Sequence, residues 1–206
     1  MRLSRSGLAI ELSKLQGFSS PSVKSEQYAT DSEIAADVLW HAFELGDIDG
    51  KRILDLGCGP GSLGIGASFL GASSVVMVDI DSSAISDATS NLAQADPDKK
   101  LPITVKEADV TTLESEVDTV IQNPPFGTKQ RHADKAFLKT AIRCAPVIYS
   151  IHKATTRGFL DAFATSNGYQ ITHAWQYSLP LKNTQSWHKK KVFYAEIICV
   201  RMIKEK

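Results

Sequence analysis

A short stretch of the chain, Asn123-Pro124-Pro125-Phe126, combines residue types that suit chemistry on a planar amine. The Asn123 side-chain carbonyl and the Pro124 backbone carbonyl are two hydrogen-bond acceptors, and an exocyclic –NH₂ group has two hydrogens to donate. Two such bonds favour a pyramidal nitrogen with its lone pair directed at an electrophile. The prolines stiffen the loop, and the Phe126 ring offers a face on which a base can stack. The tetrad therefore predicts a site that holds a planar amine during group transfer.

A second candidate site follows the apolar run 52–56, where the chain continues as Gly57-Cys58-Gly59-Pro60-Gly61 and opens a helix. Glycines let the backbone approach a ligand closely, and a helix N-terminus offers free N–H groups. Asp79 ends the next apolar run about 20 residues later, where a carboxylate can accept hydrogen bonds from both ribose hydroxyls. This spacing predicts a cofactor that contains adenosine.

The residues around this turn also indicate which cofactor it holds. Gly59, Gly61 and Gly64 satisfy the GxGxxG pattern of nicotinamide dinucleotide sites. However, Asp55 would repel a pyrophosphate and attract an ammonium group, and S-adenosylmethionine has an ammonium, a sulfonium and no phosphate. Asp109, after a third apolar run, can accept from the adenine amino group while Val110 packs on the ring. We therefore expect S-adenosylmethionine.

The elements that position these residues alternate along the chain. Runs rich in Val and Ile predict strands at 52–56, 74–78, 103–107, 117–122 and 147–151, with longer strands at 169–179 and 192–203. Helices are expected near the N-terminus and at 31–45, 62–71, 82–95, 133–144 and 155–167. The fold class is therefore α/β, with a seven-stranded, mostly parallel sheet, helices on both faces and an antiparallel C-terminal hairpin strand. We expect one domain over 1–206, in which 1–45 form a helical extension and cofactor lid and 46–206 form the core.

Composition narrows the class of protein. The chain has 206 residues, of which 43% are hydrophobic and 22% charged, as in an ordinary globular domain. Three widely separated cysteines without a CxxC pair favour a reducing, cytoplasmic compartment. The five histidines form no HxH or HxxxH pair, which argues against a metal site. No apolar run is long enough for a membrane span, and the N-terminus lacks the pattern of a signal peptide.

Charge is distributed unevenly although the net charge is zero. Residues 44–118 contain 5 Lys or Arg and 14 Asp or Glu, whereas residues 119–206 contain 14 Lys or Arg and 4 Asp or Glu. The basic second half suggests an anionic partner such as nucleic acid, although solvated surface lysines would give the same counts.

These motifs together resemble a known family. DLGCGPG (55–61), VDID (78–81), EADV (107–110) and NPPF (123–126) resemble the motifs of Rossmann-like class I S-adenosylmethionine-dependent methyltransferases that act on amino groups. EQYAT (26–30), NPPFGTK (123–129), AFLKT (136–140), YSIHK (149–153) and HKKK (188–191) resemble the methyltransferase-like protein five family, which installs N6-methyladenosine on small-subunit ribosomal RNA. The resemblance extends over nearly the whole chain.

The resemblance implies roles for individual residues. Catalysis is expected at Asn123, Pro124, Pro125 and Phe126. The implied cofactor pocket consists of Gln27, Tyr28, Thr30, Asp55, Gly57, Gly59, Pro60, Ser62, Asp79, Asp109 and Val110. The sequence departs from the family at Ala29, where members often have Pro, and this difference predicts a less rigid loop.

The resemblance and the charge pattern also suggest partners. The expected RNA-binding residues are Lys129, Arg131, Lys153, Trp187, His188, Lys189, Lys190 and Lys191. Relatives pair with a small zinc-binding methyltransferase activator through the sheet edge at the third strand, here 103–107. The sequence leaves other functions open: guanine-N2 methylation, protein-glutamine methylation, or a non-catalytic adenosylmethionine-binding factor in ribosome assembly.

Overall fold

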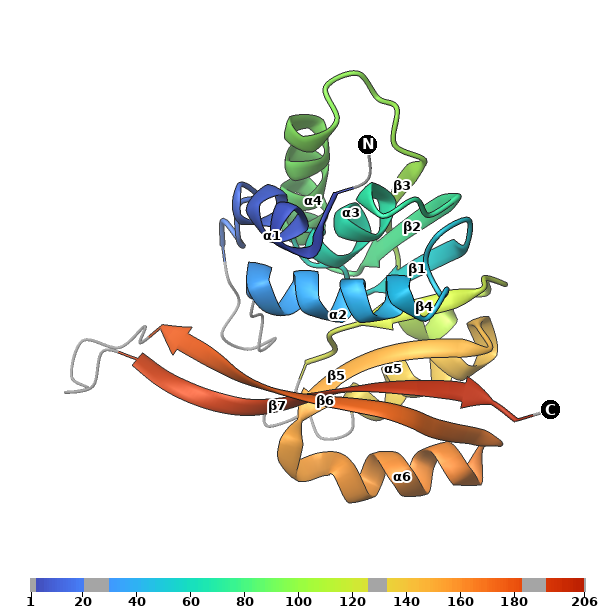
Figure 1. Ribbon diagram of the computed structural model, residues 1–206. Helices are drawn as coiled ribbons and strands as arrows, with labels where there is room; N and C mark the ends of the chain where they lie inside the picture. The colour runs from blue at the N-terminus through green and yellow to red at the C-terminus, as the bar shows by residue number, and fades with distance from the viewer. Residues whose placement is uncertain (1–2, 21–29, 126–132, 183–191, 206) are drawn as a thin grey trace.

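A computed structural model describes residues 3–20, 30–125, 133–182 and 192–205, and Figure 1 shows its arrangement. Seven strands form one sheet in the order β3-β2-β1-β4-β5-β7-β6. The strands are β1 (Arg52–Leu56), β2 (Ser74–Asp79), β3 (Ile103–Glu107), β4 (Thr119–Gln122), β5 (Val147–Lys153), β6 (Tyr169–Lys182) and β7 (Val192–Lys204). β7 runs antiparallel to both β5 and β6, and the other paired strands are parallel. The predicted fold class is confirmed.

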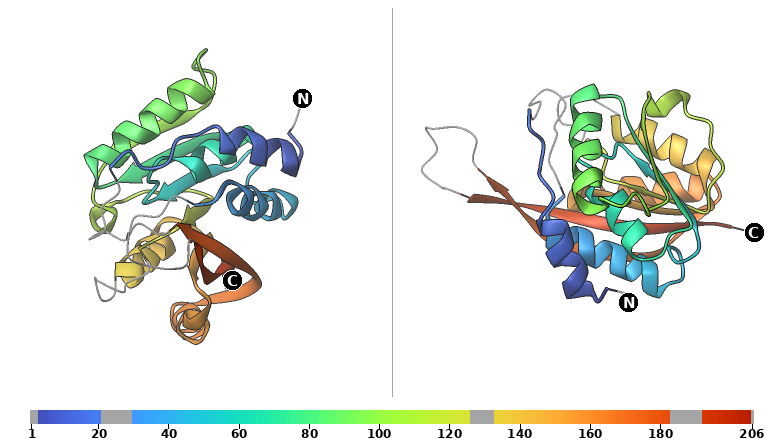
Figure 2. Two further views of the ribbon diagram at one scale, coloured as in Figure 1. Left: turned by 90° about the vertical axis from the view of Figure 1, so that its left-hand side faces the viewer. Right: turned by 90° about the horizontal axis from the view of Figure 1, so that it is seen from above.

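Helices cover both faces of the sheet (Figures 1 and 2). One core cluster joins the sheet to the first four helices and a second joins it to the last two, because side chains alternate between the faces along each strand. The first face carries α1 (Arg5–Ser13), α2 (Ser32–Glu44), α3 (Ser62–Phe69) and α4 (Ser82–Ala95), and the second carries α5 (Ala133–Cys144) and α6 (Arg157–Ser166). Short 3₁₀ turns, η1 (Val110–Thr112) and η2 (Ala154–Thr156), follow β3 and β5.

Several boundaries differ from those expected. β5 continues to Lys153 because it pairs with β7 along its whole length, which moves the start of the following helix to Arg157. β4 begins at Thr119, since the Asp118 carboxylate accepts bonds from the backbone and side chain of Arg52. The β6–β7 hairpin extends beyond the other strands, because β5 pairs only with the half of β7 from Ile197 onward (Figure 1).

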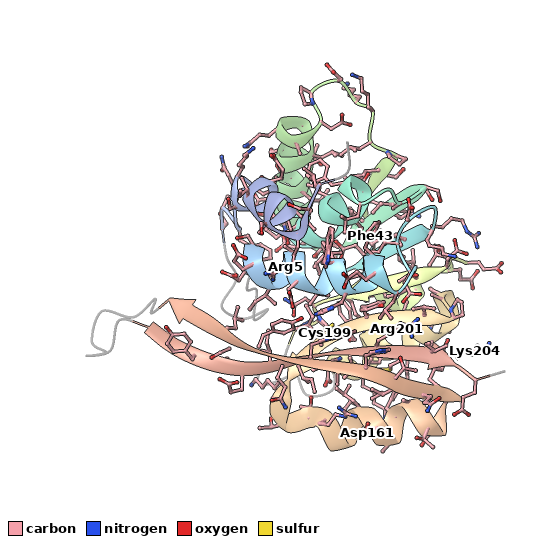
Figure 3. All side chains as sticks on the ribbon, in the orientation of Figure 1. Arg5, Phe43, Asp161, Cys199, Arg201 and Lys204 are labelled. Carbon is pink, nitrogen blue, oxygen red and sulfur yellow. The ribbon has the colours of Figure 1, made fainter. Side chains whose placement is uncertain are left out.

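The amino end of the central strands contains a buried ion pair. Asp47, after α2, accepts bonds from Arg201 Nε at 2.6 Å and from Arg201 Nη2 at 3.1 Å, and Tyr149 Oη donates to the same carboxylate at 2.6 Å. Thr119 Oγ1 donates to the Asp47 backbone carbonyl, and Arg201 Nη1 donates to Thr172. In Figure 3, Arg201 lies on β7 below the C-terminal end of α2. This cluster locks β7, β5 and the α2–β1 connection together.

β1 and β4 are neighbours in the sheet. β2 lies on the other side of β1, and β5 lies on the other side of β4, so the strand order reverses between β1 and β4. Ligands of open α/β sheets bind at the carboxyl ends of strands at such a point. The glycine-rich turn follows β1 and the Asn123 tetrad follows β4, so both lie at this edge. Within the described residues, no helix is both long and apolar enough to cross a membrane.

Candidate active site

Asn123, the first residue after β4, has its side chain fixed in place. Its Nδ2 group donates to Thr30 Oγ1 at 2.9 Å, which joins the tetrad to the residue before the α2 cap. Asp31 provides that cap by accepting from Glu33 N and Ile34 N, so Thr30 is left to bind Asn123. Because Nδ2 donates to Thr30 Oγ1, the orientation of the amide group is fixed, and with it the position of the acceptor Oδ1. Thus two residues 93 positions apart orient one hydrogen-bond acceptor.

The glycine-rich turn is tied to the end of β2. Gly57 N and Cys58 N both donate to Val78 O, at 2.8 and 2.9 Å. Gly57 and Gly59 have φ values of +68° and +53°, a region that L side chains rarely adopt. Both glycines also lie against aromatic rings. A Cβ on Gly57 would be 2.6 Å from Phe137 Cε1, and a Cβ on Gly59 would be 2.7 Å from Phe18 Cζ.

Asp79 connects the end of β2 to this turn. Its Oδ2 accepts from Gly59 N at 3.0 Å, and its Oδ1 accepts from Asp81 N at 3.0 Å. A carboxylate oxygen accepts more than one hydrogen bond, so both oxygens retain acceptor capacity. Asp81 in turn caps α4 by accepting from Ser83 N. The carboxylate therefore has a fixed orientation and can accept from two neighbouring hydroxyls.

Asp55 lies beneath the turn with only 1% of its surface exposed. Its Oδ2 accepts from Gly64 N at 2.8 Å, whereas its Oδ1 is buried without a hydrogen-bond partner. Burial raises the pKa of Asp55 to about 7; the Gly64 N–H opposes this shift and the nearby Asp79 charge adds to it. An unpaired buried carboxylate oxygen is unfavourable, and a cation at this point would satisfy it.

Asp109 begins η1 after β3. Its Oδ1 accepts from the backbone N–H and the hydroxyl of Thr111, both at 2.8 Å, and these bonds lower the pKa of Asp109. The carboxylate is therefore charged at neutral pH, with its second oxygen Oδ2 outside these bonds. Val110 is buried in the second core cluster, where its carbonyl accepts from Thr140 Oγ1.

The other predicted residues lie nearby or outside the described part of the chain. Pro60 is buried in the turn and Ser62 is the first residue of α3; Pro124 is buried and Pro125 half-buried. Lys153 ends β5, the strand beside β4. The remaining predicted site residues lie outside the described residues: Gln27, Tyr28, Phe126, Lys129, Arg131, Trp187, His188, Lys189, Lys190 and Lys191.

A buried polar chain lies next to the tetrad on the sheet. Gln122 Nε2 donates to Ser150 Oγ at 2.8 Å, and Ser150 Oγ pairs with His152 Nε2 at 2.6 Å. Burial lowers the pKa of His152 to about 4, so the imidazole is neutral at physiological pH. Gln122 Oε1, like Asp55 Oδ1, is buried without a partner. Unpaired buried oxygens thus occur on two strands at the same edge.

Three apolar residues at this edge were not among the predicted site residues. Phe18 and Phe137 contact the glycine turn, and Ile80, directly after Asp79, is 65% exposed. An exposed isoleucine at a strand end would have been a usable signal, because ligand sites are lined mainly by apolar side chains. Phe18 carries no local signal, since its contact joins distant parts of the chain, whereas Phe137 lies in the AFLKT stretch (136–140), for which no individual role was predicted.

These groups fit S-adenosylmethionine. The orphaned Asp55 oxygen suits an ammonium group, the Asp79 carboxylate suits a ribose, and Ile80 offers apolar surface for a ring. The glycine turn places backbone N–H groups against Val78 O and Asp79 rather than arranging them around a phosphate. Acidic side chains at this point also disfavour a pyrophosphate.

Comparison with known proteins agrees with this chemistry. The family model of the methyltransferase small domain matches residues 22–147. The rRNA N(6)-adenosine-methyltransferase METTL5 of Danio rerio is 36% identical and aligns over 92% of this chain and 94% of its own. The uncharacterized protein MJ0284 of Methanocaldococcus jannaschii is 32% identical over 96% of this chain and 93% of its own.

Among solved structures, PH1948 from Pyrococcus horikoshii, described as a candidate RNA methyltransferase, superimposes with a TM-score of 0.89. It shares 38% identity, and the match covers 100% of this chain and 98% of PH1948. Family model, sequence relatives and fold therefore agree: the chain belongs to the methyltransferase small domain family and is a class I S-adenosylmethionine-dependent methyltransferase.

Proposed function

We propose that this protein methylates the exocyclic N6 of an adenosine in ribosomal RNA, and specifically in the small subunit. The observation that carries the proposal is the Asn123 amide, oriented by Thr30 at the carboxyl edge of β4. Relatives that align over most of this chain, from Danio rerio and Drosophila melanogaster, are named rRNA N(6)-adenosine-methyltransferases. Their names support adenine over guanine or glutamine as the substrate.

The cofactor would be held by the residues of the glycine turn and the neighbouring strand ends. When bound, it supplies an electrophilic methyl group. Asp55 Oδ1 would accept from its ammonium group, Asp79 from its ribose hydroxyls, and Asp109 Oδ2 from its adenine amino group, with Ile80 against the ring. We extend this pocket to the other residues expected from sequence: Gln27, Tyr28, Thr30, Gly57, Gly59, Pro60, Ser62 and Val110.

The target amine would be held by two carbonyl acceptors. Asn123 Oδ1 and Pro124 O would each accept one N6 hydrogen, which directs the nitrogen lone pair away from the ring and toward the methyl group. Phe126 would stack on the base, with Pro125 stiffening the loop. No strong general base is required before transfer, because the proton becomes acidic only afterwards. A fixed acceptor pair contributes through positioning, which is worth orders of magnitude in rate.

The adenine must be unpaired or flipped out of its helix, because N6 is hidden in a paired stack. Lys153 ends β5, the strand beside β4, so the residue lies at the edge that such a nucleotide would approach. We propose that Lys129, Arg131, His188, Lys189, Lys190 and Lys191 bind phosphates with it and that Trp187 stacks on a base. The basic balance of residues 119–206 supports this surface.

Labelled methyl transfer tests the function directly. Purified protein, methyl-labelled cofactor and unmodified small-subunit or large-subunit RNA should yield label only with the small-subunit RNA, recovered as N6-methyladenosine after nucleoside analysis. Recovery as N2-methylguanosine, or label in ribosomal protein alone, would assign a different substrate. The Asn123→Ala variant is the matched control, since cofactor binding should persist while labelling falls.

Salt dependence tests the RNA surface. Replacing Lys189, Lys190 and Lys191 together with Ala should weaken RNA binding and flatten the slope of log affinity against log salt by roughly 0.7–0.9 for each phosphate that is no longer neutralised. Trp187→Ala should weaken binding with little change in slope, because stacking releases no counterions. Normal affinity and slope in the triple variant would mean that Lys189, Lys190 and Lys191 do not contact phosphates, and the RNA surface would then have to be sought around Lys129, Arg131 and Lys135.

The exposed edge of the sheet at β3 could bind a protein partner. β3 forms one edge of the sheet, with Thr104, Lys106 and Glu107 exposed, and an edge strand can be extended by a strand of another protein. We propose a heterodimer with a small zinc-binding methyltransferase activator at this edge, in the cytoplasm. Coexpression should give a 1:1 complex by size-exclusion chromatography with light scattering; separate elution of the two proteins would reject it.

A further inference from the structure

The residues that follow α1 run alongside α4 to the glycine-rich turn (Figure 2). We call residues 14–19 the N-terminal strap. Three α4 side chains bind its backbone: Gln94 Nε2 donates to Lys14 O at 3.2 Å, Asn91 Oδ1 accepts from Gln16 N at 2.8 Å, and Asp87 Oδ2 accepts from Ser19 N at 3.0 Å. Spacings of three and four place these side chains on one face of the helix. The strap is therefore a fixed part of the fold.

Asn91 is the central contact of the strap. It is 2% exposed, and its Nδ2 donates to Gln16 O and to Pro60 O, each at 2.9 Å. Together with the bond from Gln16 N to Oδ1, one buried amide joins the strap, α4 and the glycine turn. A buried amide with this many partners is costly to replace, because each partner would be left without its bond.

The strap places the Phe18 ring on Gly59. A Cβ at Gly59 would lie 2.7 Å from Phe18 Cζ and 3.4 Å from Cε1, so the ring occupies the space next to this backbone. The N–H of the same glycine donates to Asp79 Oδ2, the carboxylate suited to the ribose. Phe18 is half-buried, which leaves part of its ring for a further contact.

We propose that Phe18 is a wall of the S-adenosylmethionine pocket and that Asn91 is a positioning residue that holds Phe18 there through the strap. The ring provides apolar surface beside the cofactor's carbon chain and ribose, and it keeps Gly59 in the conformation that fixes Asp79. α1 and its strap thus belong to the cofactor site through a residue outside the sequence motifs. Removal of the Phe18 ring should weaken cofactor binding, whereas the rate of methyl transfer at saturating cofactor should change little.

Calorimetry with S-adenosylhomocysteine tests Phe18. Phe18→Ala should raise its dissociation constant about tenfold, and Phe18→Leu should restore most of the affinity by replacing the apolar surface. The matched control is Phe159→Ala: Phe159 is also partly exposed, but it packs on Phe163 of α6, on the opposite face of the sheet. A lower melting temperature for Phe18→Ala with an unchanged dissociation constant would overturn the proposal and reduce Phe18 to a packing residue.

A double-mutant cycle tests the role of Asn91. Asn91→Ala should raise the KM for cofactor with little effect on kcat, and it should add little further loss to Phe18→Ala, because both act through the ring. Additive losses would show that Asn91 acts independently of Phe18 and would overturn its assigned role. If Asn91→Ala does not fold, Asp87→Ala replaces it in the cycle, since it removes only the Ser19 bond.

Discussion

The two ends of the central sheet bury polar side chains in different ways. At the amino end, the Asp47 carboxylate receives bonds from both Arg201 and Tyr149. At the carboxyl end, Asp55 Oδ1 and Gln122 Oε1 are buried without partners. The first arrangement satisfies its charges within the protein and holds strands together. The second leaves acceptors that a ligand could satisfy, at the edge where the glycine turn and Asn123 lie. Ser68 Oγ, near the C-terminal end of α3, is also buried without a partner. The binding end is therefore distinguished by unpaired acceptors that lie next to the glycine turn and Asn123, and not by incomplete hydrogen bonding alone.

The largest effect should come from breaking the complete cluster. Arg201→Met leaves the Asp47 charge buried without a cation and should lower the free energy of unfolding by about 3–5 kcal/mol. Arg52→Met is the control: Arg52 pairs with Asp118 at the surface, and loss of this exposed pair should lower the free energy of unfolding much less than Arg201→Met does. Urea denaturation measures both. Equal losses would show that burial does not distinguish the two ion pairs.

A catalytic effect without a stability effect is expected at the other end. Asn123→Ala should lower kcat on the order of 10²-fold, because the target amine loses a fixed acceptor. Thr30→Val should lower kcat less, since the Asn123 amide is still present but loses the bond that orients it, and it should also weaken cofactor binding because Thr30 belongs to the proposed pocket. Cofactor affinity by calorimetry and the unfolding midpoint should stay near wild type for Asn123→Ala. Unchanged turnover would exclude Asn123 from the mechanism.

The Asp55 carboxylate should make cofactor binding depend on pH. Its folded pKa of about 7 lies above the usual 3.8, so the stability that Asp55 contributes without cofactor is fully present below about pH 4 and is lost as pH rises toward 7. An ammonium group prefers the ionised carboxylate. Affinity for S-adenosylhomocysteine should therefore rise by up to about tenfold per pH unit below pH 7, with a proton released on binding.

Calorimetry of S-adenosylhomocysteine binding in buffers of different ionisation enthalpy measures the number of protons released on binding. Asp55→Asn removes the titrating group, so its affinity should be lower at about pH 8 and nearly independent of pH. The same pH dependence in the variant as in the wild type would assign the proton to another residue.

The smallest effect is expected from Gln122. Gln122→Met removes the unpaired Oε1 and the bond to Ser150 together, so stability should change by about 1 kcal/mol or less. Ser150→Ala should cost more, because it leaves Gln122 Nε2 buried and unpaired. Thermal unfolding compares them. If Gln122→Met lowered the free energy of unfolding as much as Arg201→Met does, the polar side chains at both ends of the sheet would contribute equally to stability.

The parts of the molecule with local signals were predictable from sequence. Gly57, Gly59 and Asp79 follow their strands at characteristic spacings, and alternation of Val-rich runs with helices predicted the sheet that brings them to one edge. The contacts of Phe18 and the Asp47–Arg201 pair were not predicted. Each joins segments that are distant in sequence, so neither leaves a periodic or local pattern. The orientation of Asn123 by Thr30 likewise depends on the tertiary structure.

The position of β7 between β5 and β6 also constrains the order of folding. Asp47 and Arg201 are separated by 154 residues, and β6 has no strand neighbour other than β7 in the described sheet. A growing chain therefore cannot neutralise Asp47 or seat β6 until β7 has been synthesised. Such non-local pairing slows folding, and it leaves β5 and β6 without their shared neighbour in the incomplete chain. The sheet that supports the catalytic edge is thus completed only after β7, the last of its strands in chain order, has been synthesised.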